Sequence, residues 1–511
     1  MKKHYVKLLA FLLTISSLQA YENNCGNPQD NDPPDCPPVG ANPINPARGG
    51  LARHVTDIKI FGPAPFAFER IYNSRTRDYL PRSWEMGTTW TWQHNWQYEM
   101  SESGSHDPFG FPFIIVRYPE GREKYFSAVD SSGSVRVTDA NWGDRVYPTG
   151  NVGEFLLRTP AGREYIFLKT GTQYLLTQVR TGTGWKWTLE YVPQSDGLQR
   201  LSKISNNYGR SIQLTRSQVA GTNFWKIDSV SANDGRTVNY FYSTWTPTSE
   251  HVLTSVSYPG TEMATYTWVG ANSLTTGPPV LASAVDPLYP GAGSRTKYIY
   301  NYLADYGSGN IVNGTVLEER NYDTDEVIVS LPLGGGTYPK ILEGNGTEIT
   351  RKYAGDATFS FSNVIEQADG EGRKITHVYQ TAGGIANAGF RTSSTDGKGA
   401  TTNYEPDYAG RTLSTTDAYL KTSYNTYNNN GFFLSHTDEL GHSTIHTRDP
   451  VTNRISRTDY QDGAWEEFTY SPTGLMKTHR LKNGSNESMT YDSFGRLITL
   501  LDAVGKTWNY T

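Results

Sequence analysis

The chain has 511 residues, with 46 Lys and Arg against 51 Asp and Glu, which gives a formal net charge of −5. Aromatic residues make up 13% of it, including 34 Tyr and 12 Trp, so a globally disordered chain is excluded, and the acidic balance argues against nucleic-acid binding through a basic surface. A composition rich in Tyr, Trp and turn-forming residues predicts an all-β fold.

The first twenty residues are typical of a secretory signal. Lys2, Lys3 and Lys7 precede an apolar run at 8–15 that is too short to span a bilayer, and small residues up to Ala20 suit a cleavage site. No later stretch is long and apolar enough for a membrane span. We therefore expect an exported protein, located in the periplasm, on the cell surface or outside the cell.

The two cysteines lie close together after this signal. Cys25 and Cys36 both fall in the Pro- and Asn-rich segment 21–41, which is too polar to form a core. An isolated pair in an exported chain predicts a disulfide, worth about 2–3 kcal/mol for so short a loop. A reactive thiol would need a cationic neighbour, and a metal site would need further ligands.

The body of the chain is predicted to be a long run of β-hairpins. Residues 185–191 (WKWTLEY) alternate apolar and polar side chains, as a strand with one covered face does. Turn signals such as Tyr258-Pro259-Gly260 separate these runs. Each hairpin is too small to bury its own apolar face, so neighbouring hairpins must stack into one continuous sheet.

Two repeat lengths divide this body. Apolar residues recur every 25–26 positions at 176, 201, 227 and 253, which predicts repeats of about 26 residues over 151–270. Over 361–511 the step is 21 residues, and 271–360 is predicted to be an irregular β region. The 21-residue step is carried by two series, the apolar Leu413, Leu434, Ile455, Met476 and Leu497 and the acidic Asp396, Asp417, Asp438 and Asp459.

Residues 491–497 (YDSFGRL), which include Tyr491, Gly495 and Arg496, resemble the YD repeat of RHS/YD-repeat proteins. The segments 45–49 (NPARG) and 66–74 (FAFERIYNS) look like the N-terminal module of that family. The module also has a Gly-Trp-x-His-x-Tyr stretch. Here His94 and Tyr98 match it and Trp92-Gln93 depart from it. The resemblance covers about 42–511 and places the N-terminal β module at 42–150.

The resemblance implies an exported protein whose repeats wind as a spiralling sheet. Family members use such a sheet as a shell around a C-terminal toxin, or as a cell-surface adhesion scaffold. The family's self-cleaving Asp-Pro-x-Gly motif has no counterpart at the Asp-Pro pairs that begin at 107, 286 and 449. A lid, a cleavage site and a toxin domain are therefore not carried over, and the expected partner is a toxin cargo or a C-terminal part encoded downstream.

Chemistry-bearing motifs are missing from the sequence, so we expect neither catalysis nor a cofactor. Common hydrolase, metalloprotease and nucleotide-binding motifs do not occur. The best metal candidate is the pair His442 and His446, which would share a strand face, with His436 nearby. Histidines in solvated turns are common and the aspartate between them belongs to the repeat register, so this explanation is favoured and no metal is expected.

The aromatic residues allow a second hypothesis for function. Most of them belong to the repeats and are explained by packing. Trp90, Trp92 and Trp96 cluster outside the repeat register and are candidates for contact with a glycan or a protein partner. The favoured function is a non-catalytic exported scaffold that resembles the front of an RHS shell. The alternatives are a free-standing binding or adhesion module and, more remotely, a secreted hydrolase.

Overall fold

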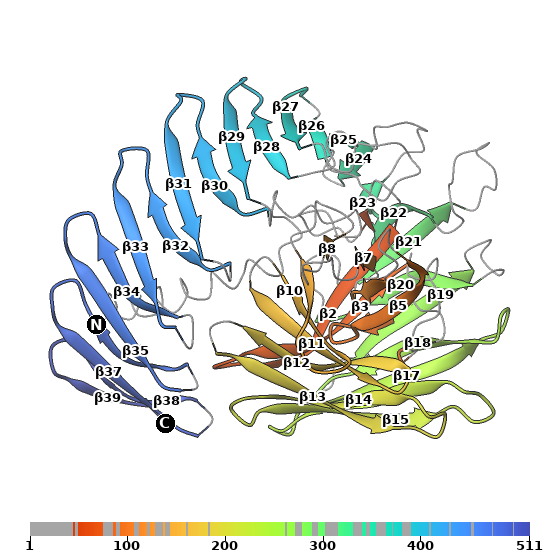
Figure 1. Cartoon of the computed structure of the whole chain (residues 1–511). Helices are drawn as coiled ribbons and strands as arrows, with labels where there is room; N and C mark the ends of the chain where they lie inside the picture. The colour runs from red at the N-terminus through yellow and green to blue at the C-terminus, as the bar shows by residue number, and fades with distance from the viewer. Residues whose placement is uncertain are drawn as a thin grey trace.

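The structure is a computed structural model (Figure 1). It describes residues 44–45, 50–74, 85–87, 92–106, 112–119, 123–127, 136–137, 144–159, 162–181, 184–260, 263–270, 278–288, 295–301, 315–330, 340–343, 348–353, 364–369, 371–380, 390–407, 410–428, 431–450, 454–472, 474–493 and 495–510. Strands and turns make up these residues, and no helix occurs in these ranges. The predicted all-β fold is confirmed.

A small N-terminal sheet precedes the main one. Its antiparallel strands are β1 (Ile44–Asn45), β2 (Gly50–Ile60), β3 (Phe66–Asn73) and β4 (Trp92–His94). The next hairpins, which join the main sheet where Met100 of β5 pairs with Tyr174 of β12, are β5 (Glu99–His106), β6 (Pro112–Arg117), β7 (Glu123–Ser127) and β8 (Arg136–Val137).

The main sheet then runs antiparallel from strand to strand. We call β9 to β22 the first coil: β9 (Arg145–Pro148), β10 (Glu154–Arg158), β11 (Arg163–Thr170), β12 (Gln173–Thr181), β13 (Lys186–Pro193), β14 (Gln199–Asn206), β15 (Ser211–Gln218), β16 (Trp225–Ala232), β17 (Thr237–Trp245), β18 (Glu250–Ser257), β19 (Met263–Gly270), β20 (Pro279–Val285), β21 (Arg295–Asn301) and β22 (Thr315–Asn321).

Three short strands lead from the first coil into the rest of the sheet: β23 (Val327–Ser330), β24 (Lys340–Glu343) and β25 (Glu348–Tyr353). We call the remainder the C-terminal arm: β26 (Val364–Asp369), β27 (Lys374–Tyr379), β28 (Arg391–Thr395), β29 (Thr401–Pro406), β30 (Thr412–Thr416), β31 (Thr422–Tyr427), β32 (Phe433–Thr437), β33 (Ser443–Arg448), β34 (Ile455–Tyr460), β35 (Trp465–Tyr470), β36 (Met476–Arg480), β37 (Asn486–Tyr491), β38 (Leu497–Leu501) and β39 (Thr507–Asn509).

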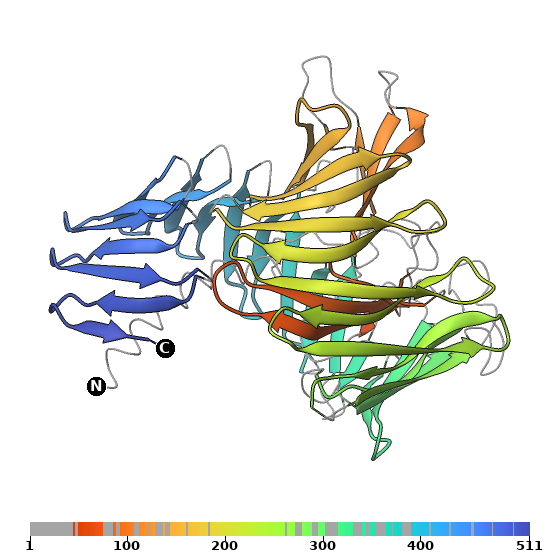
Figure 2. The ribbon, with the colours of Figure 1, turned by 90° about the horizontal axis from the view of Figure 1, so that it is seen from below.

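The sheet is open and curls around, as Figures 1 and 2 show, so that the arm comes back towards the first coil. A β-bulge recurs near the end of the second strand of the hairpins. It lies between Glu190 and Tyr191, between Phe241 and Tyr242, and between Thr469 and Tyr470, among others. A bulge bends a strand and increases its twist, so bulges at one repeated position give a curved sheet.

The residue after the bulge locks its hairpin to the preceding one. Tyr191 Oη donates to the Leu176 carbonyl at 3.0 Å, and Tyr470 Oη donates to the Ile455 carbonyl at 2.7 Å. Each acceptor lies fifteen residues before its donor. The same spacing recurs with other donors, in the pairs Tyr242–Ile227, Trp268–Leu253, Tyr427–Thr412 and Arg448–Phe433.

The region 271–360 continues the hairpin pattern in its described residues. Tyr300 Oη donates to the Leu281 carbonyl at 2.5 Å, with a separation of 19 residues in place of fifteen. A bulge again lies just before the donor, between Ile299 and Tyr300. At Tyr300 the bulge and the hydrogen bond to the preceding hairpin are therefore kept at a longer spacing.

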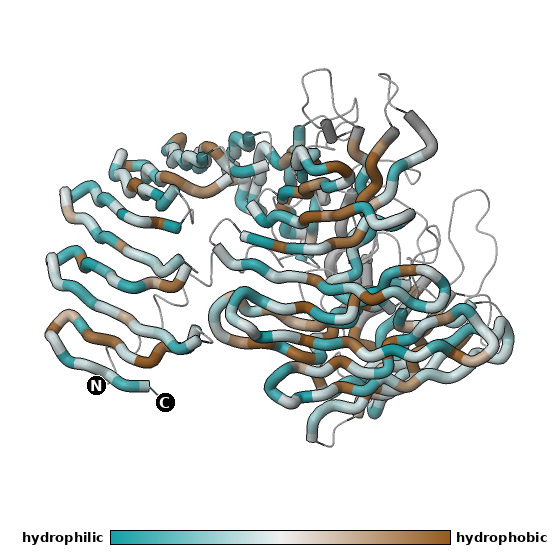
Figure 3. Tube along the Cα trace, turned by 60° about the horizontal axis from the view of Figure 1, so that its bottom comes forward, coloured by the Kyte–Doolittle hydropathy of each residue, from teal (hydrophilic) through white to brown (hydrophobic). Residues whose placement is uncertain are grey.

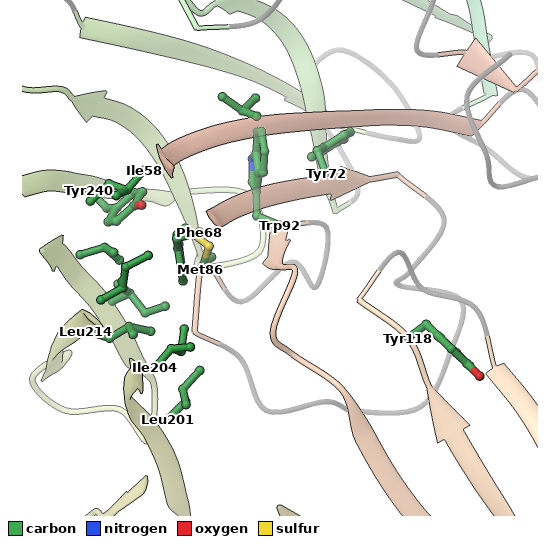
Figure 4. Packing of buried hydrophobic residues seen from close by; sticks show 14 of the residues in the cluster. Ile58, Phe68, Tyr72, Met86, Trp92, Tyr118, Leu201, Ile204, Leu214 and Tyr240 are labelled. Carbon is green, nitrogen blue, oxygen red and sulfur yellow. The ribbon is translucent and has the colours of Figure 1, made fainter. Parts of the chain in front are cut away.

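The hydrophobic core lies between the N-terminal sheet and the curve of the first coil. Ile58, Phe68 and Tyr72 are buried there beside side chains of the first coil such as Ile204 and Tyr240 (Figure 4). Among the described residues after Val316, the buried hydrophobic side chains are Phe390, Phe468 and Leu500. The arm thus has little core of its own. Within the described ranges, the search for a helix that could cross a membrane found none.

Candidate functional site

The locking residues align the arm with the first coil, and this alignment identifies one face of the sheet. Leu189, two residues before the lock Tyr191, pairs with Ile204. Asn425, two residues before the lock Tyr427, pairs with His436 in the same way. Because strand side chains alternate between faces, residues at equal distances from the lock lie on the same face. We call this the inner face.

The inner face has opposite character in the two halves. In the first coil its residues are buried and almost all apolar: Val179, Trp187, Leu189, Ile204, Ile212, Leu214, Val230, Val238, Tyr240, Val256, Ala264, Tyr266 and Ala284. The register places mostly polar residues at the same positions of the arm: Thr415, Ser423, Asn425, His436, Thr444, His446, Thr458, Glu466, Phe468, His479, Glu487, Met489 and Leu500.

The N-terminal sheet accounts for the difference. It packs against the inner face of the first coil and removes those side chains from water. In the arm, most inner-face residues, such as Asn425, Thr444 and Glu487, are only half-buried, and His436 is exposed. Figure 3 shows the arm mostly in the polar colours, with the apolar ones concentrated elsewhere. Because the described strands of the N-terminal sheet do not cover the inner face of the arm, its side chains contact water and are mostly polar.

Cross-strand hydrogen bonds order this polar face. His436 Nδ1 lies 2.9 Å from Asn425 Oδ1, and His446 Nδ1 lies 3.0 Å from Thr458 Oγ1. Burial lowers the pKa of His446, so its imidazole is neutral at neutral pH. This part of the face is thus polar but carries little charge.

The face becomes acidic towards the C-terminal end of the arm. Two carboxylates flank His479, with Glu466 Oε1 3.4 Å from its Nε2 and Glu487 Oε2 3.5 Å from its Nδ1. The His479 ring stacks on Phe468 with 4.6 Å between the centroids. Within the described ranges, no group of three or more His, Cys, Asp or Glu side chains is arranged to hold a metal ion.

Three of the repeat aspartates cap hairpin turns. Asp438 Oδ1 accepts hydrogen bonds from the backbone N–H of Leu440 and of His442, at 2.9 and 2.8 Å. Asp396 and Asp417 make the same pair of bonds. The carboxylate thereby accepts from backbone N–H groups that have no backbone acceptor within a tight turn.

Asp459 has another role. It lies inside β34, and its carboxylate accepts from the Arg457 guanidinium at 2.8 and 2.6 Å. The preceding turn, closed between Asp449 and Arg454, is one residue longer than its neighbours, so the next turn falls between Tyr460 and Ala464. Asp459 therefore keeps the 21-residue spacing of the aspartates but no longer lies at the start of a turn.

The YD-like segment forms the end of one hairpin and the start of the next. Tyr491 follows a bulge at the end of β37, and burial raises its pKa to about 12. The Arg496 backbone N–H and Nε donate to the Asp492 carboxylate at 2.8 and 2.5 Å. Gly495, between them, has a φ of +74°, which favours glycine.

The two candidate metal histidines point to different partners. His442 Nδ1 lies 3.0 Å from Asp438 Oδ2 in an exposed turn, whereas His446 belongs to the inner face and contacts Thr458. His446 remains of interest as part of a polar surface.

The tryptophan cluster is used in packing. Trp92 is 3% exposed, between Tyr72 and Tyr266, with ring centroids 5.2 Å from each. Trp96 donates from Nε1 to the Ala67 carbonyl at 2.7 Å and packs edge-on against Phe66. The Trp92 indole is therefore buried in the core, whereas Trp96 is half-buried. Trp90, Cys25 and Cys36 lie outside the described residues.

Sequence reasoning missed the inner face and the buried charges beneath it. Glu85 Oε2 lies 3.2 Å from His94 Nε2 and 2.9 Å from the Arg216 guanidinium, all buried. Although burial opposes ionisation, Arg216 and His94 lower the pKa of Glu85 to about 2. The available signal was the charged residue within apolar strands, such as Arg70 in 66–73 (FAFERIYN).

Parts of this chain are similar to known proteins. Residues 41–126 match a family model described as a domain of unknown function, DUF6531. A search of curated proteins found no match. Among solved structures, the crystal structure of TcdB2-TccC3-TEV aligns with 80% of this chain and 22% of its own, at 16% identity and a TM-score of 0.36.

Two further solved structures are similar at comparable identity. A mutant of the Photorhabdus luminescens Tc holotoxin pore aligns with 88% of this chain and 24% of its own, at 11% identity and a TM-score of 0.34. The N-terminal domain of effector protein SpvB from Salmonella typhimurium strain LT2 aligns with 69% of this chain and 100% of its own, at 11% identity and a TM-score of 0.17. The chain thus spans about a quarter of the length of the two Tc structures.

Proposed function

We propose that the chain is a non-catalytic, exported scaffold, a section of an RHS-type shell whose arm encloses a polypeptide against its inner face. The proposal rests on one observation: residues at equivalent positions of the inner face are apolar in the first coil and mostly polar in the arm. Ile212 of the first coil is buried against the N-terminal sheet, and its counterpart in the arm is the half-buried Thr444.

The chemistry of the inner face suits such an occupant. A wall of hydroxyl, amide, imidazole and carboxylate groups hydrogen-bonds to a hydrated polypeptide without offering it a large apolar patch. The repeated bulges curve the sheet, and in the first coil the equivalent face is the one that packs against the N-terminal sheet. The sequence resemblance to RHS/YD-repeat proteins agrees with this function.

A non-catalytic role is also supported by where the strongly perturbed groups lie. Glu85 and His94 are the kind of carboxylate–imidazole pair that acid–base catalysis uses, but both are fully buried between the N-terminal sheet and the first coil. A substrate has no access to them, and their contacts with Arg216 join two parts of the fold.

Cysteine labelling tests whether the inner face is covered in the natural assembly. Thr444→Cys places a thiol on the inner face, and Ile445→Cys places one on the opposite face, where the native side chain is 51% exposed. Each variant is labelled with a maleimide, once as the purified chain and once as protein isolated from the cells that naturally produce it. Peptide mass spectrometry separates these sites from the native cysteines.

The expected result is a selective loss of labelling. The thiol at 444 should react much more slowly in the natural preparation than in the chain alone, and the thiol at 445 should react equally in both. If position 444 reacts at the same rate in both preparations, nothing occupies the inner face and the proposal fails.

A further inference from the structure

Three parts of the molecule meet at the tip of the hairpin between β2 and β3. The Ala64 carbonyl at this tip accepts from Trp187 Nε1 at 3.3 Å and from Asn206 Nδ2 at 3.0 Å. Asn206 Nδ2 also lies 3.3 Å from the Pro63 carbonyl. The first coil therefore holds this tip in place.

The C-terminal arm reaches the same tip through Gly495. A Cβ added at Gly495 would lie 2.9 Å from Pro63 Cγ and 2.9 Å from Tyr208 Cδ1, closer than real Cβ atoms approach. Gly495 is in the turn between β37 and β38, far along the chain from both Pro63 and Tyr208. The missing side chain lets the arm sit directly on the tip and on Tyr208.

A second contact lies beside the first. The Arg454 guanidinium lies over the ring of Trp185, 5.6 Å from its centroid, and over Tyr470 at 5.4 Å. Burial lowers the pKa of Arg454, although nearby tyrosines oppose this. Leu475 of the arm also packs against the main core. We call these contacts, from Gly495, Arg454 and Leu475 to Pro63, Trp185 and Tyr208, the seam.

The seam differs in kind from the contacts within each sheet. Neighbouring strands are joined by ladders of backbone hydrogen bonds along the whole main sheet. Among the described residues, no backbone–backbone hydrogen bond crosses from the arm to the first coil. A few side-chain contacts are weaker than a ladder, so the seam opens at a lower free energy than the strands separate.

We propose that the seam is a latch. The arm leaves the first coil at Gly495 and Arg454 while both parts stay folded, and the hairpin tip of the N-terminal sheet is the surface on which it closes. Opening moves the inner face of the arm away from the first coil and widens the access to it. The inference goes beyond the proposed function because it holds whether or not the inner face has an occupant.

The chain offers a matched pair of variants for the test. Gly495 and Gly505 both occupy arm turns with positive φ, +74° and +82°, so alanine carries a similar backbone cost at either site. A Cβ at Gly505 meets nothing within 4 Å, whereas a Cβ at Gly495 collides with the first coil. Gly495→Ala should therefore force the seam apart, and Gly505→Ala should not.

Distances between two spin labels report the opening. The labels are placed on Val152→Cys and Tyr419→Cys, which are 100% and 85% exposed at hairpin tips of the first coil and the arm, with Cys25 and Cys36 replaced by Ser. The parent chain and Gly505→Ala should give the same distance distribution. Gly495→Ala should add a population at a different distance, with an unchanged circular dichroism spectrum.

Trp185→Leu provides a second route to the same state, since it removes the ring beneath Arg454 from a half-buried site. It should produce the same new population as Gly495→Ala. Equal distance distributions in the parent and in all three variants would overturn the latch. Loss of strand signal in Gly495→Ala or Trp185→Leu, with Gly505→Ala intact, would also overturn it, because the seam would then belong to the cooperative core.

Discussion

Arg70 and Asp286 are separated by 216 residues, yet their guanidinium and carboxylate groups lie 3.2 Å apart, and both side chains are fully buried. Arg70 also binds Asp57 at 2.7 Å and lies 5.1 Å from the ring centroid of Trp92. The hydroxyl of Tyr266 accepts a further bond from Arg70 at 2.7 Å. This cluster ties the N-terminal sheet to the first coil.

Removing the arginine should be costly. Arg70→Met leaves the carboxylates of Asp57 and Asp286 buried without their cation, which typically destabilises a protein by about 3–5 kcal/mol. Urea unfolding measures the change, with Arg236→Met as control. The Arg236 pair with Asp234 is exposed, so its loss should cost less than about 1 kcal/mol. If the two substitutions lowered the free energy of unfolding equally, the buried cluster would contribute no more to stability than an exposed ion pair.

The buried carboxyl of Glu319 should make stability depend on pH. Its oxygens have no hydrogen-bond partner among the described residues, and burial raises its pKa to about 7, against an opposing effect of Arg53. The folded state therefore holds a proton that the unfolded chain releases near pH 4.5. Between pH 4.5 and 7, this group lowers the free energy of unfolding as the pH rises.

Glu319→Gln should remove this pH dependence. The variant should match the parent chain near pH 4 and exceed it by about 3 kcal/mol at pH 8, as a rise of the pKa from 4.5 to about 7 implies. The difference between the two unfolding free energies, measured across that pH range, isolates Glu319 from other titrating groups. A difference that stays constant with pH would contradict the prediction.

The locking hydrogen bonds should each contribute to the stability of the arm. Tyr470→Phe removes the bond to the Ile455 carbonyl and keeps the ring, so the expected cost is about 1 kcal/mol in thermal or urea unfolding. Tyr424→Phe is the matched control, because this tyrosine is 53% exposed on the opposite face of β31. The lock would be unimportant if both variants unfolded like the parent.

Leu420 occupies a position that glycine fills in neighbouring repeats. Its φ is +64°, and Gly441, 21 residues later at the same place in its turn, has a φ of +85°. A left-handed conformation costs a residue with a Cβ about 1–2 kcal/mol. Leu420→Gly should therefore raise the free energy of unfolding by about 1 kcal/mol, and Gly441→Leu should lower it by a similar amount. If both variants changed the free energy of unfolding in the same direction, the inferred backbone strain at Leu420 would be wrong.

Local pattern in the sequence predicted much of the arm correctly. Strand alternation and turn residues predicted hairpins, and the 21-residue step located turns such as those capped by Asp417 and Asp438. The same step misplaced the role of Asp459, because one extra residue in the turn at 449–454 shifts the following turn without disturbing the aspartate spacing. The locking hydrogen bonds could not be predicted from the sequence, because the residue after the bulge is Tyr in some hairpins and Trp or Arg in others.

The sequence by itself determined that this chain is a stack of β-hairpins, since alternation and turn chemistry act over a few residues. Only the tertiary structure decided which face the N-terminal sheet covers, why Trp92 is buried beside Arg70 rather than exposed, and where Gly495 meets Pro63 and Tyr208. These relationships join residues far apart in the chain, and they depend on how the whole sheet curls, which no local pattern records.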